Sequence, residues 1–201
     1  MINDLLSYEN DLISQGIHII AGMDEAGRGP LAGPVAVACC IMNLDDIIDG
    51  VNDSKKLSAK KRELLFDQIK EKAICYSVVF VDEKEIDKIN ILNATKMGME
   101  KALLNMFPIP EMLLVDYVKH SFGVPYKAIV HGDALSYSIA CASILAKVTR
   151  DRLMVEYAKK YPEYGFEKHK GYGTKLHIEM LQKYNICPIH RKSFVGHFVD
   201  L

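Results

Sequence analysis

An acidic pair, Asp24-Glu25, separates an apolar run at 17–23 from the glycine-rich segment GRGP at 27–30. Two carboxylates at the end of a buried segment cost folding free energy unless a cation meets them. Mg²⁺ and Mn²⁺ favour carboxylate oxygens, and glycine lets a ligand approach the backbone closely. An isolated Asp-Glu pair is more often a solvated surface turn, so other parts of the chain must decide between these interpretations.

Apolar periodicity predicts an α/β domain. We expect strands at 17–23, 35–42, 74–81, 112–115 and 126–130, with the first two paired across the glycine-rich turn. We expect helices at 58–72, 82–90, 93–106 and 136–161, then a polar loop to 175 and a helix to 184. Strands followed by mixed strands and helices favour a mixed central sheet flanked by helices, with a small helical C-terminal extension.

Two of these helices have interpretable faces. Ser58 is a suitable N-cap for the helix to 72, whose inner face we assign to Leu64, Leu65 and Ile69. The first half of the long helix carries small residues, which permit close packing on a sheet. These are Ala140, Cys141, Ala142, Ser143 and Ala146.

Composition indicates a cytoplasmic protein. No apolar run reaches the roughly 20 residues that a membrane span needs, and the start MINDLLSYEN does not resemble a secretory signal. The five cysteines show no paired framework, which favours reduced thiols. His169, His177, Cys187 and His190 suggest a zinc cluster only weakly, because their spacings match no familiar site.

Charge is unevenly distributed along the chain. Residues 140–201 carry 11 Lys/Arg against 6 Asp/Glu, whereas residues 1–139 carry 14 against 20. An acidic front with candidate metal ligands and a basic rear suit an enzyme that acts on a polyanion, although a solvated basic helix face would look similar. We interpret Arg150, Asp151 and Arg152 as a surface ion-pair run.

Acids recur where predicted strands end. Asp116 ends the strand at 112–115, and Asp133 follows the strand at 126–130. Open α/β sheets place their ligands at strand ends, so these acids and the Asp24-Glu25 pair are expected to form a four-carboxylate cluster around a cation. Asp116 alone could start a turn, and Asp133 alone could cap the following helix.

The sequence resembles a known family, type 2 ribonuclease H, the ribonuclease HII of bacteria. The matching blocks are GMDEAGRGPLAGPV (22–35), NDSKKLS (52–58), LLVDYV (113–118), HGDALSYSIACASILAKVTRDRLM (131–154), GYGTKLH (171–177) and HRKSF (190–194). They occur in the family's order, and the resemblance covers 17–201. It implies a ribonuclease H-like fold, with a catalytic core at 17–160 and a helical substrate-binding extension at 161–201.

The resemblance implies an endonuclease that cuts the RNA strand of RNA–DNA hybrids and incises 5′ to single ribonucleotides in duplex DNA. It assigns divalent-metal binding and catalysis to Asp24, Glu25, Asp116 and Asp133. Two Mg²⁺ or Mn²⁺ ions with substrate bound would share the scissile phosphate, activate a water and stabilise the leaving 3′ oxygen. Cleavage would leave 3′-hydroxyl and 5′-phosphate ends.

The resemblance also assigns substrate contacts. Backbone groups of Gly27, Arg28 and Gly29 sense the 2′-hydroxyl that separates RNA from DNA, and Tyr172 bonds the same hydroxyl and stacks on the next sugar. Lys55 and Lys56 are candidate phosphate contacts. The same applies to Lys168, Lys170 and Lys175.

One departure lies near the proposed site, where His131 replaces the family's usual Lys before Gly-Asp. Two alternatives remain open: a non-catalytic module that binds RNA–DNA hybrids, and another metal-dependent nuclease of the same fold. The intact acids disfavour a pure binder, which would gain affinity by losing negative charge. We expect a monomer whose partner is nucleic acid and not a membrane.

Overall fold

The computed structural model describes residues 5–199, which form a five-stranded sheet in the order β3-β2-β1-β4-β5. Its strands are β1 (Ile20–Ala26), β2 (Val35–Met42), β3 (Ala73–Val81), β4 (Met112–Asp116) and β5 (Tyr126–Ile129). β1, β2 and β3 pair antiparallel, whereas β4 is parallel to both β1 and β5. The predicted α/β class with a mixed sheet is confirmed.

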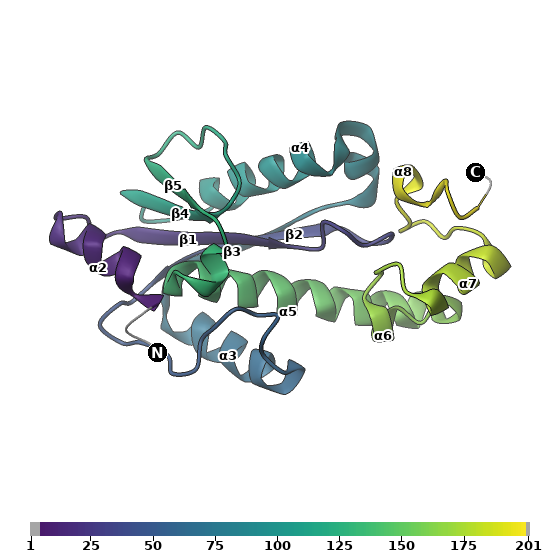
Figure 1. The fold of residues 1–201 in the computed structure, drawn as a ribbon, viewed down its shortest axis with the longest axis horizontal. Helices are drawn as coiled ribbons and strands as arrows, with labels where there is room; N and C mark the ends of the chain where they lie inside the picture. The colour runs from purple at the N-terminus through teal and green to yellow at the C-terminus, as the bar shows by residue number, and fades with distance from the viewer. Residues whose placement is uncertain (1–4, 200–201) are drawn as a thin grey trace.

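Helices cover both faces of the sheet (Figure 1). α5 (Tyr137–Lys160) and α3 (Ala59–Lys72) lie on one face, and α4 (Glu83–Leu104) lies on the other. The short α2 (Ser7–Ser14) precedes β1. Alternate residues of β2 point to opposite faces, so Cys40 packs with α3 and α5 while Cys39 packs with α4. Burial on both faces explains why β2 is a continuous apolar run.

α5 packs very closely on β1. A Cβ added at Gly22 would lie 2.0 Å from the carbonyl carbon of Ser138, so only glycine fits at this crossing. The small residues that begin α5 are all buried against the sheet, as predicted. This contact fixes the carboxyl end of β1 beside the first turns of α5.

Side-chain caps set the helix starts. Ser58 accepts a hydrogen bond from the backbone N of Lys61, and Ser136 accepts one from Ile139. In α3 the buried residues are Leu65, Phe66 and Ile69, and Leu64 is 54% exposed. The assignment of Leu64 to the inner face was wrong, because the apolar stripe turns toward Phe66 instead.

α4 contains the boundary between the two helices predicted for this region. Asn90 has φ 67° and ψ 164°, which interrupts the helix, and its side chain accepts a hydrogen bond from the backbone N of Asn93. The chain is therefore helical on both sides of a capped kink at Asn90.

The C-terminal part forms a separate small core at the far end of α5 (Figure 1). It contains η2 (Pro162–Tyr164), α6 (Phe166–His169), α7 (Lys175–Tyr184) and α8 (Lys192–Val195). The polar loop predicted up to 175 is instead partly helical and carries the buried rings of Tyr164 and Phe166. Segment 30–34 joins this unit to the sheet, since Ala32 bridges to His190 and Gly33 N donates to Ile189 O.

The end of β1 differs from the prediction. The strand does not stop at Met23 but continues through Asp24 and Glu25 to Ala26, paired with β2. Pairing with β4 stops at Met23 opposite Val115. Beyond that point the side of β1 that faces β4 is open, which leaves room for ligands at the strand end.

Gly22→Ala tests the packing of α5 on β1. We expect a loss of about 3 kcal/mol or more in the free energy of unfolding, because two backbones must separate to admit one methyl group. Urea denaturation measures this. The control Gly16→Ala lies in open space at φ 82° and should cost about 1 kcal/mol. Equal losses in the two variants would contradict the close approach.

Candidate active site

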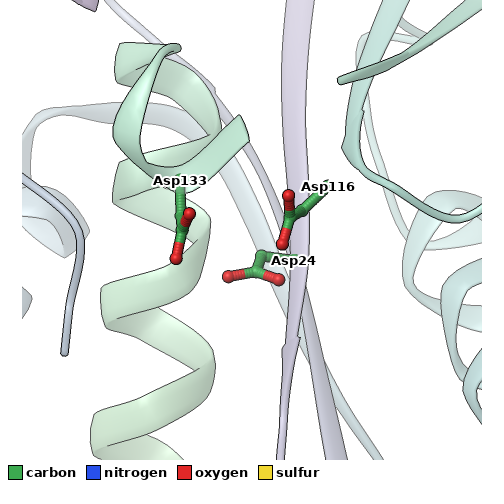
Figure 2. A group of neighbouring side chains, drawn as sticks. All are labelled: Asp24, Asp116 and Asp133. Carbon is green, nitrogen blue, oxygen red and sulfur yellow. The ribbon is translucent and has the colours of Figure 1, made fainter. Parts of the chain in front are cut away.

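Three aspartates converge at the carboxyl ends of β1, β4 and β5. Asp24 and Asp116 lie on neighbouring strands, and Asp133 follows β5 in η1 (Gly132–Ala134). One carboxylate oxygen of each lies within 4.8 Å of the other two. Figure 2 shows the three side chains gathered at one place. Carboxylate oxygens at this spacing, two of them on buried residues, form a donor set that suits a hard divalent cation.

The turn after β5 places Asp133. His131 is exposed and has φ 57°, and Gly132 N donates to Asp116 Oδ1 at 2.7 Å. A Cβ at Gly132 would lie 2.6 Å from Ile139 Cδ1, so glycine is required at this turn. Ser136 rather than Asp133 caps α5, which overturns the interpretation of Asp133 as a helix cap.

Glu25 lies beside the three aspartates and not among them. Its Oε1 is 3.3 Å from Arg28 Nη1, and its Oε2 is buried without a hydrogen-bond partner within the described chain. Successive side chains of a strand leave from opposite faces, which separates Glu25 from Asp24. The structure thus brings three of the four expected carboxylates together and places the fourth at their side with an unpaired oxygen.

Burial opposes ionisation of Asp24, Glu25 and Asp116. Desolvation raises the pKa of Asp24 well above its ordinary value, and the charges of Glu25 and Asp116 raise it further. Desolvation also raises the pKa of Glu25 and of Asp116. Bringing several carboxylates to one place is therefore unfavourable in the protein alone, and a bound cation would reverse that cost.

Lys55 contributes a positive charge to the site. Its Nζ donates to Asp133 Oδ2 at 3.0 Å, although the side chain is 76% exposed. Burial alone would lower the pKa of Lys55, but the hydrogen bond and the nearby carboxylates raise it overall. The Lys55 ammonium is thus held at Asp133 by one ion pair, while most of its side chain faces solvent.

A cavity of about 360 Å³ opens over the acids. Its lining includes five of the six residues assigned to substrate binding, namely Gly27, Arg28, Gly29, Lys55 and Tyr172. Lys56 is exposed and does not line this cavity. Ser54, Ser143 and Lys147 also line it and were not singled out from the sequence. Two segments about 140 residues apart, the glycine-rich turn and the Tyr172 loop, therefore meet at one surface.

Arg191 holds the glycine-rich turn from behind. It is fully buried and donates to Gly27 O at 2.7 Å and to Arg28 O at 2.9 Å. Burial lowers the pKa of Arg191 to about 9, which leaves it protonated at neutral pH. Because N–H and C=O of a trans peptide point in opposite directions, the amides of Arg28 and Gly29 point away from Arg191.

Arg150 is also buried, at 1% exposed, so its interpretation as a surface ion-pair residue was wrong. It donates to three backbone carbonyl oxygens, those of Ala32, Pro34 and Lys170. A Cβ at Gly27 would lie 2.0 Å from Arg150 Nε, which explains this glycine at φ 96°. The spacing of four from Ala146 through Arg150 to Met154 on a buried helix face is the sequence pattern that could have revealed it.

No helix within residues 5–199 is both long enough and apolar enough to cross a membrane.

Comparison with known proteins gives consistent matches. The family model described as Ribonuclease HII matches residues 21–197. The ribonuclease HII of Caldicellulosiruptor bescii is 56% identical over 194 residues, covering 96% of this chain and 94% of the relative. That of Ruminiclostridium cellulolyticum is 54% identical over 200 residues, covering 99% of this chain and 78% of the relative. The crystal structure of ribonuclease H2 from Pyrococcus horikoshii superposes with TM-score 0.77 and 30% identity, covering 87% of this chain and 92% of the other.

Asp24→Asn tests the electrostatic cost of the acidic cluster. The raised pKa means that the unfolded chain releases this proton first as pH rises, so the metal-free fold loses stability above the ordinary Asp range. Removing the charge should raise Tm in EDTA at pH 7 by roughly 3 °C, the shift that about 1 kcal/mol gives in a chain of this length. Mg²⁺ should raise Tm of the unaltered protein more than that of the variant.

Differential scanning calorimetry with and without EDTA measures both effects. Asp49→Asn, at an exposed position before α3, is the control and should change neither value. A lower Tm for Asp24→Asn in EDTA would mean that the Asp24 carboxylate is favourable without a cation, which contradicts the account.

Proposed function

The chain belongs to the ribonuclease HII family and is an endoribonuclease, and from that premise we propose its substrates and mechanism. It cuts the RNA strand of RNA–DNA hybrids and incises 5′ to single ribonucleotides in duplex DNA. The observation that carries this proposal is the single cavity in which Asp24 and Asp116 meet the glycine-rich turn and Tyr172. A phosphodiester in that cavity would lie between metal-binding carboxylates and groups able to read its ribose.

Asp24, Asp116 and Asp133 are the residues that would hold the metal, with Glu25 completing the set. The clustered oxygens of the three aspartates, the raised pKa of Asp24 and of Asp116, and the unpaired Glu25 Oε2 support this assignment. Two Mg²⁺ or Mn²⁺ ions held there with substrate would supply Lewis acidity toward the attacking water and the leaving 3′ oxygen. The products carry 3′-hydroxyl and 5′-phosphate ends.

Gly27, Arg28 and Gly29 read the 2′-hydroxyl through their backbone. Arg191 binds the carbonyl oxygens of Gly27 and Arg28. This contact supports an orientation in which the amides of Arg28 and Gly29 face the cavity. A ribose hydroxyl can accept from such amides, whereas a deoxyribose offers them no partner. Side chains larger than hydrogen at the two glycines would obstruct this approach.

Tyr172 completes the reading of the sugar from the opposite side. A Cβ at Gly29 would lie 3.9 Å from the ring of Tyr172, so a ribose can contact both at once. Tyr172 is 41% exposed, and its ring lies near the cations of Lys147 and Arg150. We assign its hydroxyl to the 2′-hydroxyl and its ring face to the next sugar.

The basic C-terminal extension at 161–201 contacts the rest of the duplex. A second cavity of about 640 Å³ shares Lys147 and Tyr172 with the acidic one and carries further cations. These are Arg62, Arg152, Lys168 and Lys170. Lys55 at the acidic cavity contacts the phosphate nearest the cut, while Lys56 and Lys175 are exposed and contribute through long-range attraction. We propose that the protein acts as a monomer in the cytoplasm.

A duplex with one embedded ribonucleotide tests the proposed activity. We expect incision 5′ to that ribonucleotide with Mg²⁺ or Mn²⁺, none with EDTA, and none in an all-DNA duplex. Asp24→Asn should lose more than about 100-fold in rate, beyond the loss typical for a group that only supports a metal ligand. Product ends are identified on a sequencing gel.

Each control outcome excludes one reading. Binding of hybrid without cleavage would favour the non-catalytic module, and equal cutting of all-DNA duplex would favour a general nuclease of the same fold. Cleavage that persists in EDTA would contradict the metal mechanism.

Tyr172→Phe tests the role of the tyrosine hydroxyl. Removing one hydrogen bond to the 2′-hydroxyl should lower kcat/KM for the single-ribonucleotide duplex by about tenfold. Tyr184→Phe, at a half-exposed tyrosine in α7, is the matched control and should leave the rate unchanged. An unchanged rate in Tyr172→Phe would remove this hydroxyl from its assigned role.

A further inference from the structure

Three histidines outside the acidic cavity are buried together in the C-terminal core: His169, His177 and His190. The rings of His169 and His177 stack at 4.5 Å between centroids, and those of His177 and His190 lie 5.2 Å apart. Phe166 contacts all three rings. Each ring nitrogen of the three has a hydrogen-bond partner, so the cluster is a connected network and not incidental packing.

The backbone fixes the tautomer of His190. Cys187 N–H donates to His190 Nδ1 at 2.9 Å, and Cys187 O lies farther from the same nitrogen, at 3.3 Å. A proton on Nδ1 would meet the Cys187 N–H, so Nδ1 is an acceptor and carries no proton. In a neutral imidazole the proton is then on Nε2. That nitrogen lies 3.0 Å from His177 Nε2 and donates to it.

The tautomer of His177 follows from that of His190. Since His177 Nε2 accepts, its proton is on Nδ1, which lies 2.9 Å from the carbonyl oxygen of Tyr172. His177 Nδ1–H therefore donates to Tyr172 O. The hydrogen bonds run in one direction, from the Cys187 amide through two rings to the backbone of the loop that carries Tyr172.

His169 binds the same loop at the neighbouring residue, Gly171. Gly171 N–H donates to His169 Nδ1 at 3.2 Å, so His169 Nε2–H donates to Tyr164 O at 2.8 Å. The ring of Tyr172 lies near the cations of Lys147 and Arg150. Within residues 5–199 the Tyr172 hydroxyl makes no hydrogen bond to protein, so its position depends on the anchored backbone.

The network requires neutral rings. A proton added to His177 Nε2 would face the Nε2–H of His190, and one added to His190 Nδ1 would face the Cys187 amide. Burial lowers the pKa of His177 and of His190 to about 4, which keeps both neutral at physiological pH. A charge on His177 would also oppose protonation of His190, and a charge on His169 would oppose protonation of His177.

We propose that His190 and His177 form a directional hydrogen-bond relay that positions Tyr172 for discrimination between ribose and deoxyribose. They act through Tyr172 and touch no substrate, so they are positioning residues. The inference rests on the proposed role of Tyr172 in reading the 2′-hydroxyl. It assigns to the C-terminal core a part in specificity in addition to contact with the duplex.

Histidine ¹⁵N NMR tests the relay without any substrate. At pH 7 we expect His177 to be protonated at Nδ1 and His190 at Nε2, each as a single tautomer. Opposite or mixed tautomers at either ring would overturn the relay. This result does not depend on whether the enzyme incises at single ribonucleotides.

Variants of His177 test its effect on specificity, measured as the ratio of kcat/KM for a single-ribonucleotide duplex to that for a long hybrid. His177→Leu removes both ring nitrogens and should lower this ratio about tenfold. His177→Asn keeps a donor at the position of Nδ1 and should stay within about threefold of the unaltered protein. Loss of the same size in both variants would contradict donation to Tyr172 as the cause.

A double-mutant cycle separates positioning from general destabilisation. In a Tyr172→Ala background, His177→Leu should change the ratio by less than about twofold, because the side chain through which it acts is gone. A further tenfold loss there would overturn the proposal. If circular dichroism shows that His177→Leu does not fold, the tautomers and His177→Asn test the proposal instead. His177→Asn must then retain the ratio of kcat/KM values.

Failure of the proposed function gives a different pattern. An unaltered protein that cuts hybrids but does not incise at single ribonucleotides would refute that substrate assignment. A different result is the expected tautomers together with a kcat/KM ratio that neither His177→Leu nor Tyr172→Ala changes. That result would refute the assigned role of the Tyr172 loop and, with it, the relay's role in specificity.

Discussion

Electrostatic repulsion among Asp24, Asp116 and Asp133 is the constraint on which the rest of the structure depends. Three strand ends bring carboxylate oxygens within 4.8 Å of one another, and burial opposes the ionisation of the first two. Such an arrangement persists only where the surrounding fold is rigid enough to hold it. Here α5 is pressed onto β1 at Gly22, and the Gly132 amide binds Asp116. Burying these carboxylates together costs folding free energy through desolvation and repulsion. A bound cation would offset that cost.

Buried arginines and histidines hold the two loops of the site by hydrogen bonds to their backbone groups. Arg191 donates to carbonyl oxygens of the glycine-rich turn, and Arg150 donates to those of Pro34 and of Lys170, which precedes the Tyr172 loop. The histidines do the same for the Tyr172 loop with neutral rings. Both loops are irregular backbone, whose polar groups need partners when buried. Placing those partners behind the loops leaves the opposite side of each loop open to the cavity.

The sequence predicted the sheet, most helices and the acids at strand ends, because those features follow from local periodicity and capping. The helix after Ser58 and the strand ending at Asp116 are examples. It did not predict that Asp24 lies inside a strand, because pairing with β2 continues where pairing with β4 stops. It misassigned Arg150 because a charged residue is rarely buried, and the five donors of guanidinium found carbonyl partners from distant segments. The separation of Glu25 from the three aspartates follows from the same continuation of β1, because adjacent residues of a strand leave from opposite faces.

The central claim is that the three aspartates are a metal site, and anomalous diffraction from crystals soaked in Mn²⁺ tests it most directly. The account predicts an anomalous peak bonded to oxygens of Asp24 and Asp116, and its loss in crystals of Asp24→Asn. A protein that is active with Mn²⁺ yet shows its anomalous peak elsewhere, with none at the aspartates, would contradict the account.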